Sequence, residues 1–226
     1  MAVITLHQRK GKVILPRTKP LAILPKTDYT RPDNINPNQR IVIMAAGLCK
    51  RWKNYLGIPK QFAPVNGEPI IKRTIRLLKE RGITDIWVTV RHTGQYGNLG
   101  VREYINFEHN QYSIDRLYGA RELSPAIYLY GDVYYTESAI DTILTDSNDF
   151  RFFGRRHAGI IKNNREIYAI KANDFVIQKA AELRELHASH KVFNSLGGHL
   201  LIHCLGFPIN PRTRDHTAGR DRKSVV

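Results

Sequence analysis

The sequence has few cysteines and no long apolar run, and these shortages exclude several classes of protein. Only Cys49 and Cys204 occur among 226 residues, which rules out a disulfide framework and favours a reducing compartment. No apolar run approaches the roughly 18 residues that a membrane-spanning helix needs. The apolar stretch at 13–15, behind a basic N-terminus, is too short for a secretory signal. We therefore expect a cytoplasmic protein with no membrane association.

Acidic residues are also scarce relative to basic ones. Asp and Glu number 20 against 35 Lys and Arg, which gives a net charge of +15 and a pI near 10.0. Such a balance favours either nucleic acid or small polyanions, such as a nucleoside triphosphate, as the partner. The basic residues are spread along the chain, without a long block or a nucleic-acid recognition motif. We favour small polyanions and expect any nucleic-acid binding to be weak, salt-sensitive and non-specific.

The length is enough for one domain with its own core. Residues 1–39 carry five prolines among many cations, and we expect them to form an extended arm and linker. The domain is predicted to span 40–212. Residues 213–226 are expected to form a basic tail. Its last residues, GRDRKSVV, show no apolar pattern that would pack into a core, so truncation of the tail stays an open alternative. The sequence does not indicate an oligomeric state.

From residue 41 the pattern alternates between strands and helices. A strand at 41–45, a helix with an apolar stripe from Ile70 to its stop signal at Gly82, and a strand at 83–90 predict a parallel pair with a right-handed crossover. Further strands are expected at 126–130, 150–153 and 166–171, with a polar turn at 162–165 and a last apolar segment at 199–207. Helices are expected after Thr136 and after Asn173, and a short one at 101–107 among the loops of 91–124.

The stretch 41–60 has the composition of a phosphate-binding loop. After the apolar strand come small residues that let backbone N–H groups approach an anion: Ala45, Ala46 and Gly47. Cations follow that supply charge: Lys50, Arg51, Lys53 and Lys60. The sequence therefore predicts an anion site directly after the first strand of the domain. It contains no Walker loop.

These residues carry a resemblance to a known family. The run from Ala45 to Arg51, followed by Pro59-Lys60, resembles the signature of the sugar-phosphate nucleotidyltransferases and MobA-like NTP transferases, roughly Ala-Ala-Gly-x-Gly-x-Arg, a spacer, then Pro-Lys. The continuation to Ile71, with Gly67-Glu68-Pro69, resembles the family's Gly-x-Pro segment. Cys49 stands where the family usually has its second glycine. The resemblance implies a three-layer α/β/α Rossmann-like fold with a mostly parallel mixed sheet.

The order of the strands predicts where the site lies. In an open parallel sheet, ligands bind beyond the carboxyl ends of the strands. The loop from Ala46 follows the first strand and Asp132 follows the third, so both should emerge at one edge. The resemblance points the same way, because Gly131-Asp132-Val133 is similar to the family motif whose Asp holds a divalent cation. We therefore expect Lys60 and Asp132 to lie close together.

The resemblance also implies the roles of individual residues. Nucleotide binding is assigned to Ala45, Ala46, Gly47, Lys50, Arg51 and Lys60. Arg51 would bind the β- and γ-phosphates and Lys60 would stabilise charge at the α-phosphate, so both count as catalytic. Mg²⁺ is the implied cofactor, with Asp132 as ligand and Asp215 as second ligand. Asp215 belongs to a late stretch, 213–221, in which Thr217 and Gly219 replace the family's acidic residue and proline. Arg155 and Arg156 are candidates for the substrate phosphate, and Asn110, Ser113 and Arg116 for the base and sugar.

The reaction that the resemblance implies is transfer of a nucleoside monophosphate from an NTP to a sugar 1-phosphate, or a similar phosphorylated alcohol, with release of pyrophosphate. Two alternatives stay open. One is a cytidylyltransferase of the isoprenoid-precursor type, because the sequence Pro59-Lys60-Gln61-Phe62 also resembles the corresponding segment of those enzymes. The other is a catalytically weak or inactive nucleotide-binding protein of the same fold. Cys49 and the altered late motif are the features that favour this alternative. The base and the acceptor are not indicated.

Overall fold

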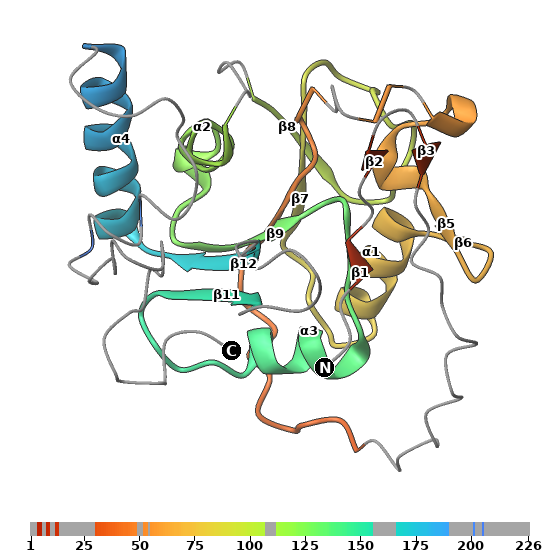
Figure 1. Ribbon diagram of the computed structural model, residues 1–226. Helices are drawn as coiled ribbons and strands as arrows, with labels where there is room; N and C mark the ends of the chain where they lie inside the picture. The colour runs from red at the N-terminus through yellow and green to blue at the C-terminus, as the bar shows by residue number, and fades with distance from the viewer. Residues whose placement is uncertain are drawn as a thin grey trace. The chain divides into compact units, whose positions relative to one another are not determined.

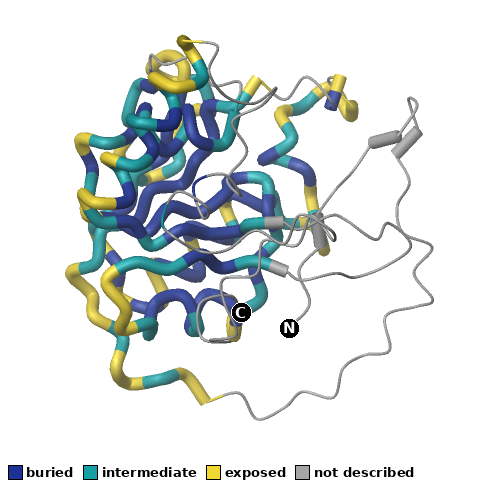
Figure 2. The backbone as a smooth tube through the Cα atoms, turned by 60° about the vertical axis from the view of Figure 1, so that its left-hand side comes forward, coloured by how far each residue is buried: buried dark blue, intermediate teal, exposed yellow. Residues whose placement is uncertain are grey.

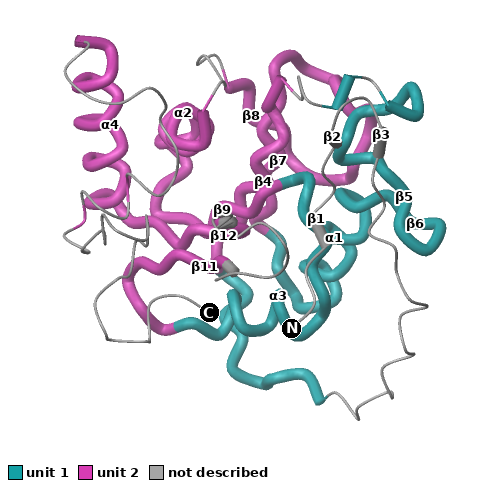
Figure 3. Tube along the Cα trace, viewed as in Figure 1, with its two compact units in different colours: residues 1–38, 49–84, 131–146 teal, residues 39–48, 85–130, 147–226 magenta. Residues whose placement is uncertain are grey.

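The computed structural model describes residues 30–48, 52–53, 55–106, 112–155, 166–189, 201 and 205, and the backbone of 4–5, 8–9 and 12–13; of 155 and 166 it describes the backbone alone. The chain divides into two compact units (Figure 3). The first unit contains 1–38, 49–84 and 131–146, and the second contains 39–48, 85–130 and 147–226. The predicted turn at 162–165 and most of the segment 199–207 lie outside the described residues.

The second unit is built on a six-stranded sheet in the order β11-β12-β9-β4-β7-β8 (Figure 1). Its strands are β4 (Ile41–Met44), β7 (Ile86–Val90), β8 (Arg102–Ile105), β9 (Ala126–Tyr130), β11 (Arg151–Arg155) and β12 (Glu166–Ala172). Strand β4 pairs in parallel with β7 and β9, and β7 pairs in parallel with β8. Of these six strands, β12 alone runs the other way, antiparallel to β9 and β11. The prediction of an α/β fold with a mostly parallel mixed sheet is confirmed.

The centre of this sheet is apolar on both faces. Every residue of β4 and of β9 is buried, as the dark tube of the sheet shows (Figure 2). A parallel strand covered on both sides needs a continuous apolar run and not an alternating one, which is why IVIM and AIYLY were recognisable as strands. Helix α4 (Asp174–Ala188) packs on α2 (Ser113–Tyr118) and contacts β12, and η3 (Arg121–Leu123) leads into β9.

The prediction of a short helix at 101–107 is wrong. Residues 102–105 form β8, because β7 offers a free parallel edge and the side chains pair across it. The guanidinium of Arg102 lies 5.2 Å from the Trp87 ring, and the Tyr104 ring lies 6.5 Å from it edge-on. Helix α2, for which the sequence offered no Ser, Thr, Asn or Asp at the N-cap, forms nearby because Asp115 accepts a hydrogen bond from the Tyr112 N–H at 3.0 Å.

The first unit holds the elements that flank the predicted motif. They are η1 (Tyr55–Gly57), η2 (Lys60–Phe62), β5 (Pro64–Val65), β6 (Glu68–Pro69), α1 (Ile70–Lys79), β10 (Val133–Tyr134) and α3 (Glu137–Leu144). Asn66 and Gly67 have positive φ angles of 52° and 80° in the β5–β6 turn, as a tight hairpin requires. Near the N-terminus, β1 (Ile4–Thr5) pairs with β10, and β2 (Gln8–Arg9) pairs with β3 (Lys12–Val13).

The predicted helix signals are confirmed at three places. Gly82, with φ 78°, ends α1, and the Ile83 N–H turns back to the Leu78 carbonyl at 3.2 Å. This reversal uses the residues before 86, so the strand predicted from 83 begins three residues later. Thr136 caps α3 by accepting from the Ala139 N–H, and Asn173 caps α4 by accepting from the Val176 N–H, each at 3.2 Å. Among the described residues, no helix is long and apolar enough to cross a membrane.

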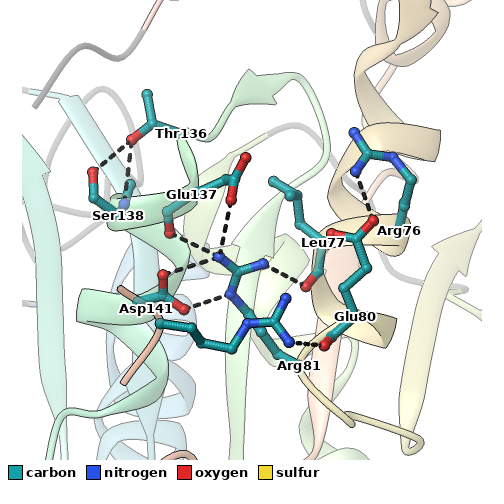
Figure 4. A network of polar contacts seen from close by, with 10 residues as sticks. Arg76, Leu77, Glu80, Arg81, Thr136, Glu137, Ser138 and Asp141 are labelled. Atoms are coloured by element: carbon teal, nitrogen blue, oxygen red, sulfur yellow. Dashed lines mark hydrogen bonds and ion pairs between the residues drawn. The ribbon is translucent and has the colours of Figure 1, made fainter. Parts of the chain in front are cut away.

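A buried ion pair joins the turn after α1 to α3 (Figure 4). The Arg81 side chain is fully buried and donates from Nη2 to Asp141 Oδ2 at 2.9 Å, from Nε to Oδ1, and from Nη1 to the Leu77 carbonyl at 2.9 Å. Burial raises the pKa of the Asp141 carboxyl to about 6, and the two hydrogen bonds from the Arg81 guanidinium favour its charged form. The pair fixes the end of α1 against the helix that follows Asp132.

Candidate nucleotide and metal site

Lys60 and Asp132 form an ion pair within the first unit. The Lys60 Nζ lies 2.7 Å from the Asp132 Oδ2, and the two side chains are 16% and 30% exposed. The structure thus brings together the cation of the Pro-Lys motif and the carboxylate of the Gly-Asp-Val motif, which are far apart in the sequence. At this distance the ammonium donates a charge-assisted hydrogen bond. Both groups keep access to solvent, which a residue that contacts a substrate needs.

The position of Lys60 follows from its neighbours. Pro59, with φ −57° and ψ 144°, is the N-cap residue of the short helix η2, and the Phe62 N–H donates to the Pro59 carbonyl at 2.8 Å. Behind this turn, the buried side chains of Trp52, Ala63 and Ile70 pack as one cluster. The Trp52 Nε1 donates to the Ile58 carbonyl at 2.8 Å, one residue before Pro59. Packing therefore holds the loop that carries Lys60.

Asp132 lies in the turn between β9 and β10, and its surroundings are equally fixed. Strand β10 pairs with β1, with Tyr134 opposite Ile4. The guanidinium of Arg73, from α1, lies over the Tyr134 ring, 4.8 Å from its centroid. Helix α3 begins five residues after Asp132 and is fixed by Arg81. Contacts from α1 and from Arg81, two residues after its end, therefore hold the segment after Asp132.

The residues here fit a magnesium ion held mainly by its substrate. Among the described residues, no group of three or more His, Cys, Asp or Glu could hold a metal ion. Mg²⁺ is commonly bound through one or two carboxylates, with substrate phosphates and water completing its octahedron. Asp132 supplies a partly exposed carboxylate of the required kind. Asp215, the predicted second ligand, lies outside the described residues.

In the second unit, the backbone after β4 is closely engaged with β7. The N–H groups of Ala45 and Ala46 both donate to Thr89 Oγ1, at 2.9 and 3.3 Å, and the Tyr96 hydroxyl donates to the Ala45 carbonyl at 2.7 Å. These four residues are buried. The two alanine N–H groups, expected to face an anion, are thus already hydrogen-bonded to protein. The small alanine side chains allow this close approach, and within the described part of the chain Gly47 is the first residue of the run whose N–H is not used in this way.

Thr89 and Arg116 were not recognised as parts of this arrangement from the sequence alone. A Cβ placed on Gly47 would stand 3.5 Å from Cζ and Nε of Arg116, so the guanidinium lies against the glycine. Thr89 could have been noticed as the polar residue inside the apolar run WVTV. Arg116 was expected only in a general role near base and sugar. Its contact with Gly47 depends on how α2 folds back, which no local pattern indicates.

Several predicted site residues lie outside the described residues, and one is described by its backbone alone. Lys50, Arg51, Arg156 and Asp215 are outside the described residues, as are Cys49 and Cys204. Arg155 is the last residue of β11, opposite Glu166 of β12, and only its backbone is described. The roles assigned to these residues therefore stay predictions.

The segment that contains Lys60, Asp132 and the loop after β4 is similar to a known protein family. The family model of the MobA-like NTP transferase domain matches residues 41–147. This segment is therefore similar to the NTP transferase domains of that family. The matched residues include the loop after β4, Lys60 and Asp132. The predicted late motif and residues 155–156 lie outside the matched segment.

Solved structures show the same fold. A protein of Aquifex aeolicus VF5 is 12% identical over 82% of this chain and 95% of its own, with a TM-score of 0.52. The 2-C-methyl-D-erythritol 4-phosphate cytidylyltransferase of Thermus thermophilus is 12% identical over 80% of this chain and 92% of its own, with a TM-score of 0.51. At these identities the likeness establishes the fold and not the substrate. No curated protein sequence matches the chain.

Proposed function

We propose that this NTP transferase domain moves a nucleoside monophosphate from an NTP to a sugar 1-phosphate, or a similar phosphorylated alcohol, and releases pyrophosphate. The observation that carries the proposal is the 2.7 Å contact between Lys60 and Asp132. A family match alone would be satisfied by a domain that had lost its chemistry. Here the cation and the carboxylate that the reaction needs are adjacent, partly exposed and held by packed elements.

The proposed reaction asks the protein for alignment and charge rather than for a base. A phosphate oxygen of the acceptor attacks the α-phosphorus of the NTP, the bond from that phosphorus to the bridging oxygen breaks, and pyrophosphate leaves with the electron pair. Because the acceptor phosphate is already anionic at neutral pH, no group has to remove a proton. In this proposal the ammonium of Lys60 stabilises the negative charge that builds on the α-phosphate.

Asp132 is the proposed ligand of Mg²⁺. When bound, the ion would neutralise and orient the phosphate oxygens of the substrate. The contact with Asp132 also limits the conformations open to Lys60, so that its ammonium stays beside the proposed metal ligand instead of extending into solvent. Arg51 would add a bidentate contact to the β- and γ-phosphates. The partners in this proposal are an NTP and a small phosphorylated acceptor.

Pyrophosphate release is the direct test. The full chain is incubated with Mg²⁺, each of the four NTPs in turn, and a panel of sugar 1-phosphates and other phosphorylated alcohols. We expect release with one pair, dependent on both substrates and abolished by a chelator. NTP binding without release for any pair would overturn the proposal and indicate a nucleotide-binding protein without turnover. The panel should include an isoprenoid-precursor alcohol phosphate with CTP, because that pair separates the cytidylyltransferase alternative.

A further inference from the structure

Arg116 has hydrogen-bonding capacity that the described part of the chain does not use. Its Nε is buried and has no hydrogen-bond partner, and none of the described carboxylates forms an ion pair with it. The adjacent Asp115 is not available, because it accepts from Arg184 Nε at 3.1 Å and from the Tyr112 N–H at 3.0 Å. A guanidinium left in this state beside a polypeptide backbone is costly unless something else accepts its hydrogen bonds.

The side chain is directed at the loop after β4. The Cζ and Nε of Arg116 lie 3.5 Å, and its Nη1 3.7 Å, from the position that a Cβ would take on Gly47. The absence of a side chain at 47 therefore leaves the face of the guanidinium open at this point. The N–H groups of Ala45 and Ala46 are taken by Thr89. Among the described residues, the Gly47 N–H and the Arg116 side chain are therefore nearby donors that neither Thr89 nor a described carboxylate engages.

The backbone of Arg116 is fixed at the edge of the sheet where ligands bind. Asn106 directly follows β8, its N–H donates to the Val90 carbonyl at 2.8 Å, and its Nδ2 donates to the Arg116 carbonyl at 3.3 Å. Gly119 allows this fit, because a Cβ there would overlap the Asn106 side chain. Helix α2 is thereby fastened to the carboxyl ends of β7 and β8. Gly47 follows the carboxyl end of β4, which is parallel to both.

We propose that Arg116, together with the backbone at Gly47, binds a phosphate group of the NTP. This inference rests on the proposed function and adds to it a phosphate-binding cation that lies outside the family signature. A guanidinium offers only donors, so it selects a group that presents acceptor oxygens, and a phosphate presents them in the geometry that suits its fork. A contact with the base would instead make affinity depend on which base is present.

Inorganic tripolyphosphate is a suitable probe because it has no base. Its affinity for the full chain is measured by calorimetry for the wild type, Arg116→Gln, Arg116→Lys and Arg102→Gln. The last is a matched control: Arg102 loses the same charge, is 65% exposed, and lies at the opposite end of β8. We expect Arg116→Gln to weaken tripolyphosphate binding by about tenfold to a hundredfold. Arg116→Lys should retain part of the affinity, and Arg102→Gln should stay within about twofold of the wild type.

Each outcome either supports or overturns this proposal. An equal loss of affinity for tripolyphosphate and for all four NTPs in Arg116→Gln, with an unchanged melting temperature, supports it. Unchanged tripolyphosphate affinity overturns it, and so does a loss confined to particular NTPs, which would assign Arg116 to the base. Absence of any tripolyphosphate binding to the wild type also overturns it. Binding that depends on Arg116, in a protein that releases no pyrophosphate with any substrate pair, would support this inference while refuting the proposed function.

Discussion

Replacing Asp132 by Asn tests the metal assignment, and the structure indicates how much stability the change should cost. Asp132 accepts from Lys60 at 2.7 Å, with 30% of its own side chain exposed. Asn keeps an oxygen that can accept from Lys60 but removes the charge. A partly exposed charge-assisted hydrogen bond lies between surface and buried pairs in strength, so we expect a loss of about 1–2 kcal/mol in the free energy of unfolding. For a chain of this size that lowers the melting temperature by about 2–8 °C.

The expected effect of Asp132→Asn on catalysis is much larger. A neutral amide is a poor ligand for Mg²⁺, so the phosphate oxygens would lose most of their neutralisation during transfer. We expect pyrophosphate release to fall by about a hundredfold or more, and the Mg²⁺ concentration for half-maximal activity to rise. Lys60→Gln should lower the rate to a similar extent while leaving the Mg²⁺ dependence nearly unchanged. This contrast separates the role of a metal ligand from that of a cation acting on phosphate.

The control for Asp132→Asn is Asp149→Asn, which removes the same charge from an exposed loop residue. It should leave both the melting temperature and the rate as in the wild type. Wild-type activity and wild-type Mg²⁺ dependence in Asp132→Asn would refute the metal assignment. A collapse of the fold in that variant would refute the modest stability cost expected of a partly exposed pair, since the ion pair would then be a main support of the unit.

Three further predictions concern the supports of the site. Thr89→Val should lower the free energy of unfolding by about 2–4 kcal/mol, measured by urea denaturation, because two buried N–H groups lose their acceptor, whereas Thr89→Ser should cost under about 1.5 kcal/mol. Arg81→Met should cost about 3–5 kcal/mol by the same measurement, because it leaves Asp141 buried and unpaired. Gly47→Ala should fold as the wild type does, since its Cβ meets the Arg116 guanidinium at an ordinary contact distance, yet should bind tripolyphosphate less tightly.

The elements that were predicted well from the sequence are those specified by local patterns. The continuous apolar runs of β4 and β9 could only be central strands. The Thr136 and Asn173 caps and the Gly82 stop signal are interactions between residues a few positions apart. The strand at 102–105 was missed because its local composition also suits a short helix. What decides between the two is the free edge of β7 and the Trp87 ring, which the local sequence does not contain.

The same distinction applies to the site. The proximity of Lys60 and Asp132 could be predicted because the carboxyl ends of parallel strands meet at one edge of a sheet. The family motif indicated which residues at that edge to consider. The hydrogen bonds to Ala45 and Ala46 could not be anticipated, because they depend on Thr89 facing that loop from the neighbouring strand. A pattern of small residues predicts that something comes close to the backbone. It does not say whether a phosphate or another part of the protein does so.

This distinction changes what a glycine-rich signature can be taken to mean. In this chain the alanines of the signature pack the loop onto β7, and the residue that we propose faces a ligand is Gly47, with Arg116 beside it. A cation supplied from α2 does not depend on the residues between 48 and 51, so the cysteine at position 49 need not remove anion binding from this edge. The prediction is that Cys49→Gly changes tripolyphosphate affinity less than Arg116→Gln does. The reverse order, measured by calorimetry under the same salt conditions, would mean that the loop itself provides most of the binding.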